Sequence, residues 1–223
     1  MTTAVVGSAI VQACDAIRRR LGGVEGDTGD VRTLLARSGL GSIEELAQWS
    51  PPGGGADGIK ALYQGRVNGN GGAYKDGDMA FAFGAHFVEV RVHANTREIR
   101  VPRSVSAFAA GRIINERTAR SQLMGGVIWG LSSALRERAE LDLRASRYVN
   151  ENLGEYLIPV NADIGEVDIL LIPEVDTTVP GLGVKGVGEL GNPGVDAAVA
   201  NAVFHATGKR VRRLPIRIED LFA

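Results

Sequence analysis

The stretch that decides the organisation of this chain is GLGVKGVGELGNPGVDAAVANAVFHATG, residues 181–208. Its first half, residues 181–194, contains six glycines in fourteen positions, a density that excludes a regular helix or strand. The second half predicts a helix over 193–207, because Asn192 can cap it, proline stands at its first position and Gly208 follows its end. We therefore expect a glycine loop that leads directly into the start of a helix.

Glu189 is the candidate functional residue of this loop, because it stands between glycines in the run GVKGVGELG. Small neighbours let a carboxylate approach a ligand closely, and the free backbone N–H groups of such a loop can hold an anion. The spacing is also that of a plain connector with a solvated glutamate. A phosphate-binding loop is less well matched, because neither a Walker A pattern nor a clean GxGxxG after a strand is present. The residues alone indicate a ligand-facing loop with one carboxylate.

Two elements that precede this loop have clear hydrophobic patterns. Val88, Val90 and Val92 alternate with polar residues and predict a hairpin over 79–101. Residues 117–140 predict the longest helix, whose apolar stripe runs at helical spacing from Leu123. On another line of this helix stand Gln122, Gly126 and Gly130. Each interior glycine costs roughly 0.5–1 kcal/mol relative to alanine. We therefore expect another backbone or a ligand to approach this line closely.

The remaining segments indicate an α+β fold in which mixed sheets pack with helices, because helices and strands do not alternate as regular βαβ units. We expect a helix over 7–21 with the thiol of Cys14 buried on its apolar side. Two short helices are expected within 30–49, and a buried strand over 167–172. The polar, glycine-rich composition of residues 51–78 predicts a flexible stretch.

Composition limits the classes of function. With 25 Lys and Arg against 26 Asp and Glu, the net charge of −1 provides no general attraction to nucleic acid or anionic lipid. No apolar run approaches the roughly 18 residues of a membrane span, and the start has no basic segment typical of an export signal. The single cysteine excludes an iron–sulfur cluster held by this chain alone, and the three histidines have no metal-ligand spacing. We expect no metal ligand among the side chains.

Five segments, in order along the chain, carry a resemblance to one known family: TTAVVGSAIVQAC (2–14), FGAHFVEV (83–90), GRIINERTARSQLMGGVIWGL (111–131), VNENLGEYLIPVNADI (149–164) and KGVGELG (185–191). Together they resemble the C-terminal part of the molybdenum-binding large subunit of the xanthine dehydrogenase and aldehyde oxidase family. The amino-acid sequences of the last two segments are most similar to those of the bacterial three-subunit aldehyde dehydrogenases. The resemblance implies that residues 1–223 form the C-terminal molybdopterin-binding region of such a subunit.

The resemblance also assigns roles to individual residues. Glu189 matches the catalytic glutamate, and Gln122 matches the glutamine that hydrogen-bonds the pterin. Further cofactor contacts are implied for the turn of Thr3, Ala4 and Val5, for the loop residues Lys185, Gly186 and Gly188, and, more weakly, for Gly84 and Ala85.

The implied activity is the oxidation of aldehydes, or the hydroxylation of N-heterocycles such as purines, with oxygen derived from water. Glu189 would act as the general base, a role that contributes about 10²–10⁴-fold to a rate. The implied cofactor is molybdenum–molybdopterin in its cytosine dinucleotide form. The implied partners are the rest of the large subunit, a small 2Fe-2S subunit and an FAD-binding subunit. The expected location is the cytoplasm, or the periplasm where the signal of a partner carries the complex.

The family's large subunit is several times longer than this chain, which implies a truncated piece or the product of a split gene. We therefore expect the isolated chain to bind cofactor weakly or not at all and to have no turnover. The alternative is a non-catalytic fragment or assembly module that keeps the fold but lacks half of the cofactor site. An unrelated α+β domain is the third hypothesis.

Overall fold

The computed structural model describes residues 2–22, 30–49, 60, 63–65, 73–75, 78–179 and 181–222. The chain divides into two compact units, and each is described by itself. The first unit consists of Met1–Phe81 and Val175–Lys185, and the second of Ala82–Glu174 and Gly186–Ala223. The stretch expected to be flexible, 51–78, lies mostly outside the described residues. Within it the structure gives strand β1 (Ala73–Lys75), which pairs antiparallel with β2 (Asp78–Met79).

Two helices of the first unit are described in full, α1 (Thr2–Arg20) and α2 (Val31–Arg37). The prediction of a helix within 30–49 is confirmed for α2, whose cap Asp30 accepts a hydrogen bond from the backbone N–H of Arg32 at 3.3 Å. The prediction of a second helix there is wrong, because residues 42–49 are neither helix nor strand. The side chain of Glu45, which could have completed a capping box, instead binds Arg20 at 2.5 Å.

The prediction of a buried thiol is also wrong, because Cys14 is exposed. Apolar side chains of α1 remain exposed among the described residues, with Ile10 56% accessible. The parts of α1 that do pack are the face of Gly7 against Leu182 and that of Ser8 against Gly181. The first unit thus covers only a narrow face of α1. The other apolar residues of the helix, including Cys14, remain uncovered.

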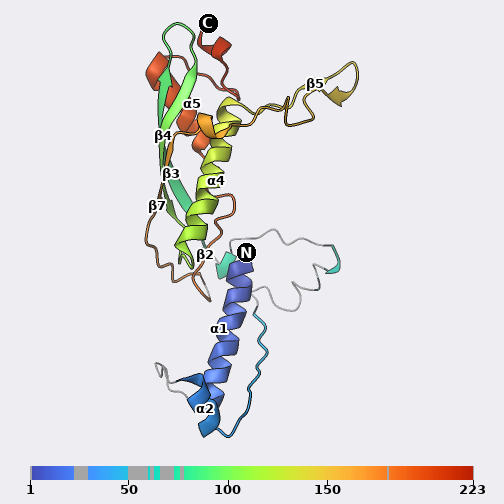
Figure 1. Ribbon diagram of the computed structural model, residues 1–223, viewed down its shortest axis with the longest axis vertical. Coiled ribbons are helices and arrows are strands. Elements are labelled where there is room, and N and C mark those ends of the chain that lie inside the picture. Colours follow the sequence, from blue (N-terminus) through green and yellow to red (C-terminus); the bar gives the residue numbers. More distant parts are fainter. Residues whose placement is uncertain are drawn as a thin grey trace. The chain divides into compact units, whose positions relative to one another are not determined.

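The second unit is built on a three-stranded mixed sheet with the order β3-β4-β7 (Figure 1). The predicted hairpin is confirmed as β3 (Phe83–Val92) and β4 (Ile99–Ala109), which pair antiparallel. Strand β7 (Glu166–Leu171) then joins β4 in the parallel direction. This is the strand predicted over 167–172, although only Ile169 is fully buried in it.

Two helices pack on one face of this sheet, α4 (Glu116–Leu135) and α5 (Val195–Thr207). Helix α4 begins as predicted, since the side chain of Asn115 accepts a hydrogen bond from Thr118 N at 3.1 Å. Its predicted stripe lies in the core, together with one face of α5 and the inner face of the sheet. The fully buried side chains of this core are Phe108, Leu123, Val127, Val195, Val199 and Val203.

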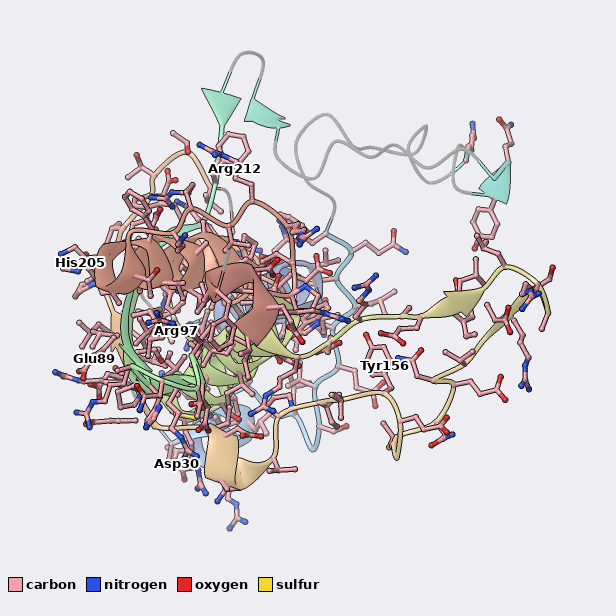
Figure 2. All side chains as sticks on the ribbon, turned by 90° about the horizontal axis from the view of Figure 1, so that it is seen from above. Asp30, Glu89, Arg97, Tyr156, His205 and Arg212 are labelled. Carbon is pink, nitrogen blue, oxygen red and sulfur yellow. The ribbon has the colours of Figure 1, made fainter. Side chains whose placement is uncertain are left out.

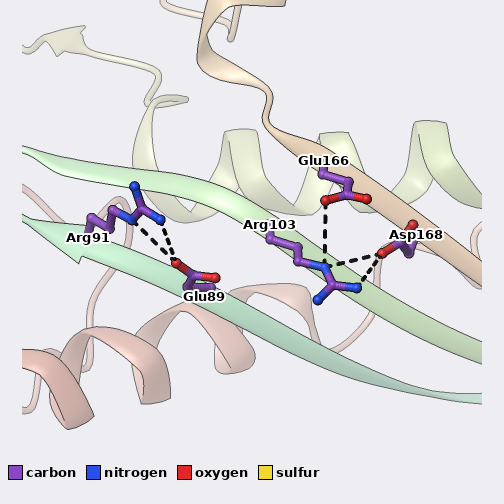
Figure 3. Close-up of polar contacts among 5 residues, drawn as sticks. All are labelled: Glu89, Arg91, Arg103, Glu166 and Asp168. Atoms are coloured by element: carbon purple, nitrogen blue, oxygen red, sulfur yellow. Dashed lines mark hydrogen bonds and ion pairs between the residues drawn. The ribbon is translucent and has the colours of Figure 1, made fainter.

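The opposite face of the sheet carries ion pairs (Figure 3). Arg103 of β4 lies between two carboxylates of β7, with Asp168 at 2.9 Å and Glu166 at 3.8 Å. Glu89 and Arg91 form a second pair on β3. These solvated groups identify this face as the outer one, so the sheet and helices form two layers.

The segment after α4 leaves these two layers (Figure 1). It contains the short pair β5 (Leu141–Asp142) and β6 (Arg147–Tyr148), and it returns through the 3₁₀ turn η1 (Asn161–Asp163). Tyr156 lies on this segment, apart from Glu89 and His205 of the layers (Figure 2). The chain then ends in η2 (Ile218–Leu221). The mixed sheet with packed helices confirms the α+β class.

Candidate functional site

The Glu189 loop, defined as residues 186–194, belongs to the second unit and contains no helix or strand, as the glycine density predicts. The carboxylate of Glu189 is exposed, and it makes no hydrogen bond or ion pair with the described residues. Its backbone is nevertheless fixed in a turn, because Asn192 N donates to Glu189 O at 3.0 Å. The loop thus presents an unpaired carboxylate on an ordered backbone.

The residue that joins this loop to helix α4 is Gln122. Its side-chain Nε2 donates a hydrogen bond to the carbonyl oxygen of Gly188 at 2.6 Å. The structure therefore brings together the two residues that the sequence singled out most strongly, Gln122 and Glu189. The amide oxygen of Gln122 can still accept a hydrogen bond, since the amide carries both donors and an acceptor.

Close packing between glycines supports the same junction. A Cβ atom on Gly126 would lie 2.7 Å from Gly191 Cα, and one on Gly130 would lie 2.5 Å from Val195 Cβ. The predicted close approach along this line of α4 is thus an approach by the Glu189 loop and by the start of α5. Gly125 is different, because a Cβ there would meet no described atom within 4 Å.

Gly186 and Gly188 have no such internal reason to be glycine. A Cβ on either would meet nothing within 4 Å among the described residues, and neither has a positive φ. Packing requires glycine at positions 126 and 191. At positions 186 and 188, the absence of a side chain leaves open space beside Glu189. We refer to the open space beside Gly186 and Gly188 as the cradle.

The far end of the loop is held by His86 of β3, a residue for which the sequence analysis proposed no role. Its Nδ1 lies 2.8 Å from Ser106 Oγ and its Nε2 lies 3.1 Å from the carbonyl oxygen of Pro193. Burial lowers the pKa of His86, and the hydrogen bond to Pro193 opposes this effect in part. A signal was available, because His86 is two residues before Val88 and so belongs to the inward face of the strand.

The start of α5 differs from the prediction at Asn192. The helix begins at Val195, and its N-cap is Gly194, with φ of 96° and no side-chain cap. Asn192 and Pro193 therefore belong to the loop rather than to the helix. The reason is the tight packing around Gly191 and Gly194, which favours glycine geometry over an asparagine cap; a Cβ on Gly194 would lie 3.3 Å from the His86 ring.

The weaker candidates on β3 are Gly84 and Ala85. A Cβ on Gly84 would lie 2.5 Å from the ring of Phe108, so packing alone accounts for this glycine. Ala85 is exposed. Neither residue has a described contact with the Glu189 loop.

The remaining candidates belong to the first unit. Thr3, Ala4 and Val5 lie in the first turns of α1 rather than in a turn before it. Lys185 is buried, and its ammonium group donates to Phe81 O at 3.0 Å and pairs with Asp176 at 2.8 Å. The hydrogen bond from Lys185, helped by those from Thr178, lowers the pKa of Asp176 to about 2. Lys185 therefore has a structural role in its own unit.

Side chains beside the Glu189 loop can transfer a proton and form hydrogen bonds. Across the described residues, no group of three or more His, Cys, Asp or Glu side chains could hold a metal ion. Over the same residues, no helix has the length and apolarity to cross a bilayer.

The second unit is thus an α+β domain of a mixed sheet and two helices, with an exposed carboxylate on a glycine-rich loop. The chain belongs to the molybdopterin cofactor-binding domain family, whose family model matches residues 1–165. The Glu189 loop lies beyond the matched residues.

Individual relatives agree with this family. The chain is 46% identical over 139 residues to the aldehyde oxidoreductase molybdenum-binding subunit PaoC of Escherichia coli (strain K12), a match that covers 62% of this chain and 19% of that protein. It is 33% identical over 148 residues to a probable xanthine dehydrogenase component of Bacillus subtilis, covering 65% of this chain and 19% of the relative. The chain thus spans about a fifth of the length of these curated relatives.

A solved structure shows the same fold. The aldehyde oxidoreductase from Desulfovibrio desulfuricans matches with a TM-score of 0.70 and 23% identity, covering 99% of this chain and 22% of that one. The predicted resemblance to the molybdenum-binding subunits is confirmed.

Proposed function

We propose that this chain is part of the molybdenum-binding subunit of a molybdenum hydroxylase that oxidises aldehydes, with Glu189 as the general base. The observation that carries the proposal is the free carboxylate of Glu189. It follows two glycines that internal packing does not require, Gly186 and Gly188, on a loop that Gln122 fastens to helix α4. The preference for aldehydes is supported by the 46% identity with PaoC, which exceeds the 33% identity with the xanthine dehydrogenase component.

The described residues fit a molybdopterin cofactor. Gln122 has an acceptor oxygen free for the pterin, and the open space at Gly186 and Gly188 admits a group close to the backbone. When bound, the cofactor would supply an activated water-derived oxygen and a two-electron acceptor. Thr3, Ala4 and Val5, with the backbone N–H groups at the start of α1, would bind its anionic groups. Lys185 would fix the chain just before the cradle.

The part played by Glu189 is proton removal. A carboxylate acts as a general base when it lies within hydrogen-bond reach of the proton that it takes, about 2.6–3.2 Å between heavy atoms. The turn closed by Asn192 holds the Glu189 backbone, so that only side-chain rotation remains to be restricted by substrate and cofactor. Exclusion of water from the cradle would strengthen every polar interaction inside it.

The finer assignments rest on the family resemblance of the five sequence segments. We propose the cytosine dinucleotide form of the cofactor, and partners comprising the rest of the large subunit, a 2Fe-2S subunit and an FAD-binding subunit. The complex would act in the cytoplasm. N-heterocycles are the second substrate class, because a probable xanthine dehydrogenase component is also among the relatives.

The test is co-expression of this gene with its genomic neighbours, followed by purification of the complex. We expect molybdenum in the complex by elemental mass spectrometry and aldehyde-dependent reduction of a dye. Glu189→Gln should lower kcat by about 10²–10⁴-fold while leaving the molybdenum content unchanged. The matched control is Glu151→Gln, an exposed glutamate on the segment after α4, which should leave kcat unchanged.

Full activity of the Glu189→Gln complex would contradict the proposal. This chain covers only 19% of the length of its relative PaoC. We therefore expect a different result when the chain is expressed alone. In that form it should contain little or no molybdenum and show no turnover. A complex that contains this chain and no molybdenum would support the non-catalytic assembly module instead.

A further inference from the structure

We infer that His86 is a positioning residue that fixes the Glu189 loop by holding the carbonyl group of Pro193. Its catalytic consequence rests on the proposed function of Glu189, whereas the tether itself does not. The inference stands on the geometry of one imidazole ring that joins the hairpin to the end of the loop. The contacts on the two ring nitrogens are directed at different elements, Ser106 of β4 and Pro193 of the loop.

The hydrogen-bond partners define the tautomer. The carbonyl oxygen of Pro193 can only accept, so Nε2 of His86 must carry the proton that it shares over 3.1 Å. In a neutral ring, Nδ1 is then an acceptor, and the hydroxyl group of Ser106 donates to it over 2.8 Å. Ser106 is 1% exposed and pairs directly with His86 across the two strands, so the ring has a rigid base.

The ring has packing contacts besides the hydrogen bonds at its nitrogens. Phe108 and His86 make an edge contact with 5.4 Å between ring centroids and 73° between planes. A Cβ on Gly194 would lie 3.3 Å from His86 Cδ2, so that glycine at 194 lets the backbone close onto the imidazole. His86 thus fills a fitted place between the β4 strand and the loop.

The tether at Pro193 is transmitted to Glu189 through a short turn. Asn192 N donates to Glu189 O, and Val195 N donates to Asn192 O, so the residues from 189 to 195 form consecutive hydrogen-bonded turns. Gln122 holds Gly188 on the other side of the carboxylate. The backbone of Glu189 therefore lies between two side-chain anchors, one from α4 and one from β3.

Charged and titratable groups lie near the ring in a groove between β3 and α5. Besides His86, the groove is lined by Glu89, Arg103, Asn201 and His205. Glu89 and Arg103 belong to the sheet and His205 to α5, and all three are exposed. Glu89 and His205 are labelled in Figure 2. His205 therefore offers a matched control, being a histidine of the same groove with no described hydrogen bond to the loop.

The experiment compares His86→Gln with His86→Asn in the full chain. Glutamine places an amide donor near the position of Nε2 and can keep the bond to Pro193, whereas asparagine reaches only toward Ser106. Hydrogen exchange of the peptide covering 186–195 is measured by mass spectrometry, with His205→Asn as control. We expect the loop to exchange about two- to tenfold faster in His86→Asn, the size of one lost hydrogen bond. His86→Gln and His205→Asn should stay near the wild-type rate.

A second measurement needs no variant, and so remains decisive if both substitutions unfold the chain. The ¹⁵N spectrum of the imidazole should show His86 protonated at Nε2 and unprotonated at Nδ1. A ring protonated at Nδ1, or equal loop exchange in His86→Asn and His86→Gln, would overturn the inference. Neither readout requires molybdenum, so failure of the tether is distinguishable from failure of the proposed activity.

Discussion

Two adjacent glycines of helix α4 provide a sharp test of how the Glu189 loop is held. Gly126→Ala would place a methyl group 2.7 Å from Gly191 Cα, 2.8 Å from its carbonyl carbon and 3.0 Å from Asn192 N. All three are backbone atoms, so no side chain can rotate away. Gly125→Ala would place the same methyl group in open space.

The magnitudes follow from opposing effects. Replacing an interior glycine by alanine favours a helix by about 0.8–1 kcal/mol, and this gain is common to both variants. Overpacking against fixed atoms costs about 1–3 kcal/mol, and this cost applies to Gly126→Ala alone. We therefore expect Gly125→Ala to raise the free energy of unfolding by up to about 1 kcal/mol. The free energy of unfolding of Gly125→Ala should exceed that of Gly126→Ala by about 1–3 kcal/mol.

The assay is urea unfolding followed by the fluorescence of Trp129, which lies on α4 beside both positions. A Trp49→Phe background leaves Trp129 as the sole tryptophan of the chain, which has two. Hydrogen exchange of residues 186–195 should rise in Gly126→Ala and stay unchanged in Gly125→Ala. Equal unfolding free energies for the two variants would refute the close contact between α4 and the loop.

Two further predictions concern the stability of each unit. In the first unit, the pKa of Asp176 is lowered to about 2 from an ordinary 3.8, so its ionised form stabilises the fold above about pH 4, and this contribution is lost as the pH falls toward 2. Asp176→Asn should therefore flatten the pH dependence of the Trp49 unfolding midpoint between pH 4 and 2, and an unchanged slope would argue against the Lys185 pair. In the second unit, Leu123→Ala should cost about 2–5 kcal/mol by urea unfolding, because Leu123 is 0% exposed. Its neighbour Met124 is 38% exposed, so Met124→Ala should lower the free energy of unfolding by less than about 1 kcal/mol. Equal losses for Leu123→Ala and Met124→Ala would contradict the burial of the Leu123 face of α4.

Sequence patterns predicted the helices and strands that are determined by residues close to one another in the chain. The alternation around Val88 gave the hairpin, and the cap at Asn115 gave the start of α4. The prediction of a second helix within 30–49 failed, because Glu45, which could have capped that helix, instead pairs with Arg20, 25 positions away. Burial of Cys14 failed for a related reason, since helical spacing cannot say how much of a helix its neighbours cover.

The contact between the Glu189 loop and helix α4 was predicted for the same reason. Glycine spacing and the line of Gln122 along α4 pointed to the loop and to its junction with the helix. The tether from His86 could not be found by spacing, because 107 positions separate it from Pro193. Likewise, the charge of Lys185 gave no indication that Asp176 would neutralise it inside the first unit.

The two anchors of the Glu189 loop have a consequence for the order of folding. Gln122 and Gly188 are 66 positions apart, and His86 and Pro193 are 107 apart. Contacts between such distant positions form only after the chain between them has collapsed, because closing a long loop costs entropy in advance. During synthesis, the hairpin and α4 leave the ribosome before the loop exists. The backbone of Glu189 should therefore acquire its fixed position last, when the scaffold that supports it is already assembled.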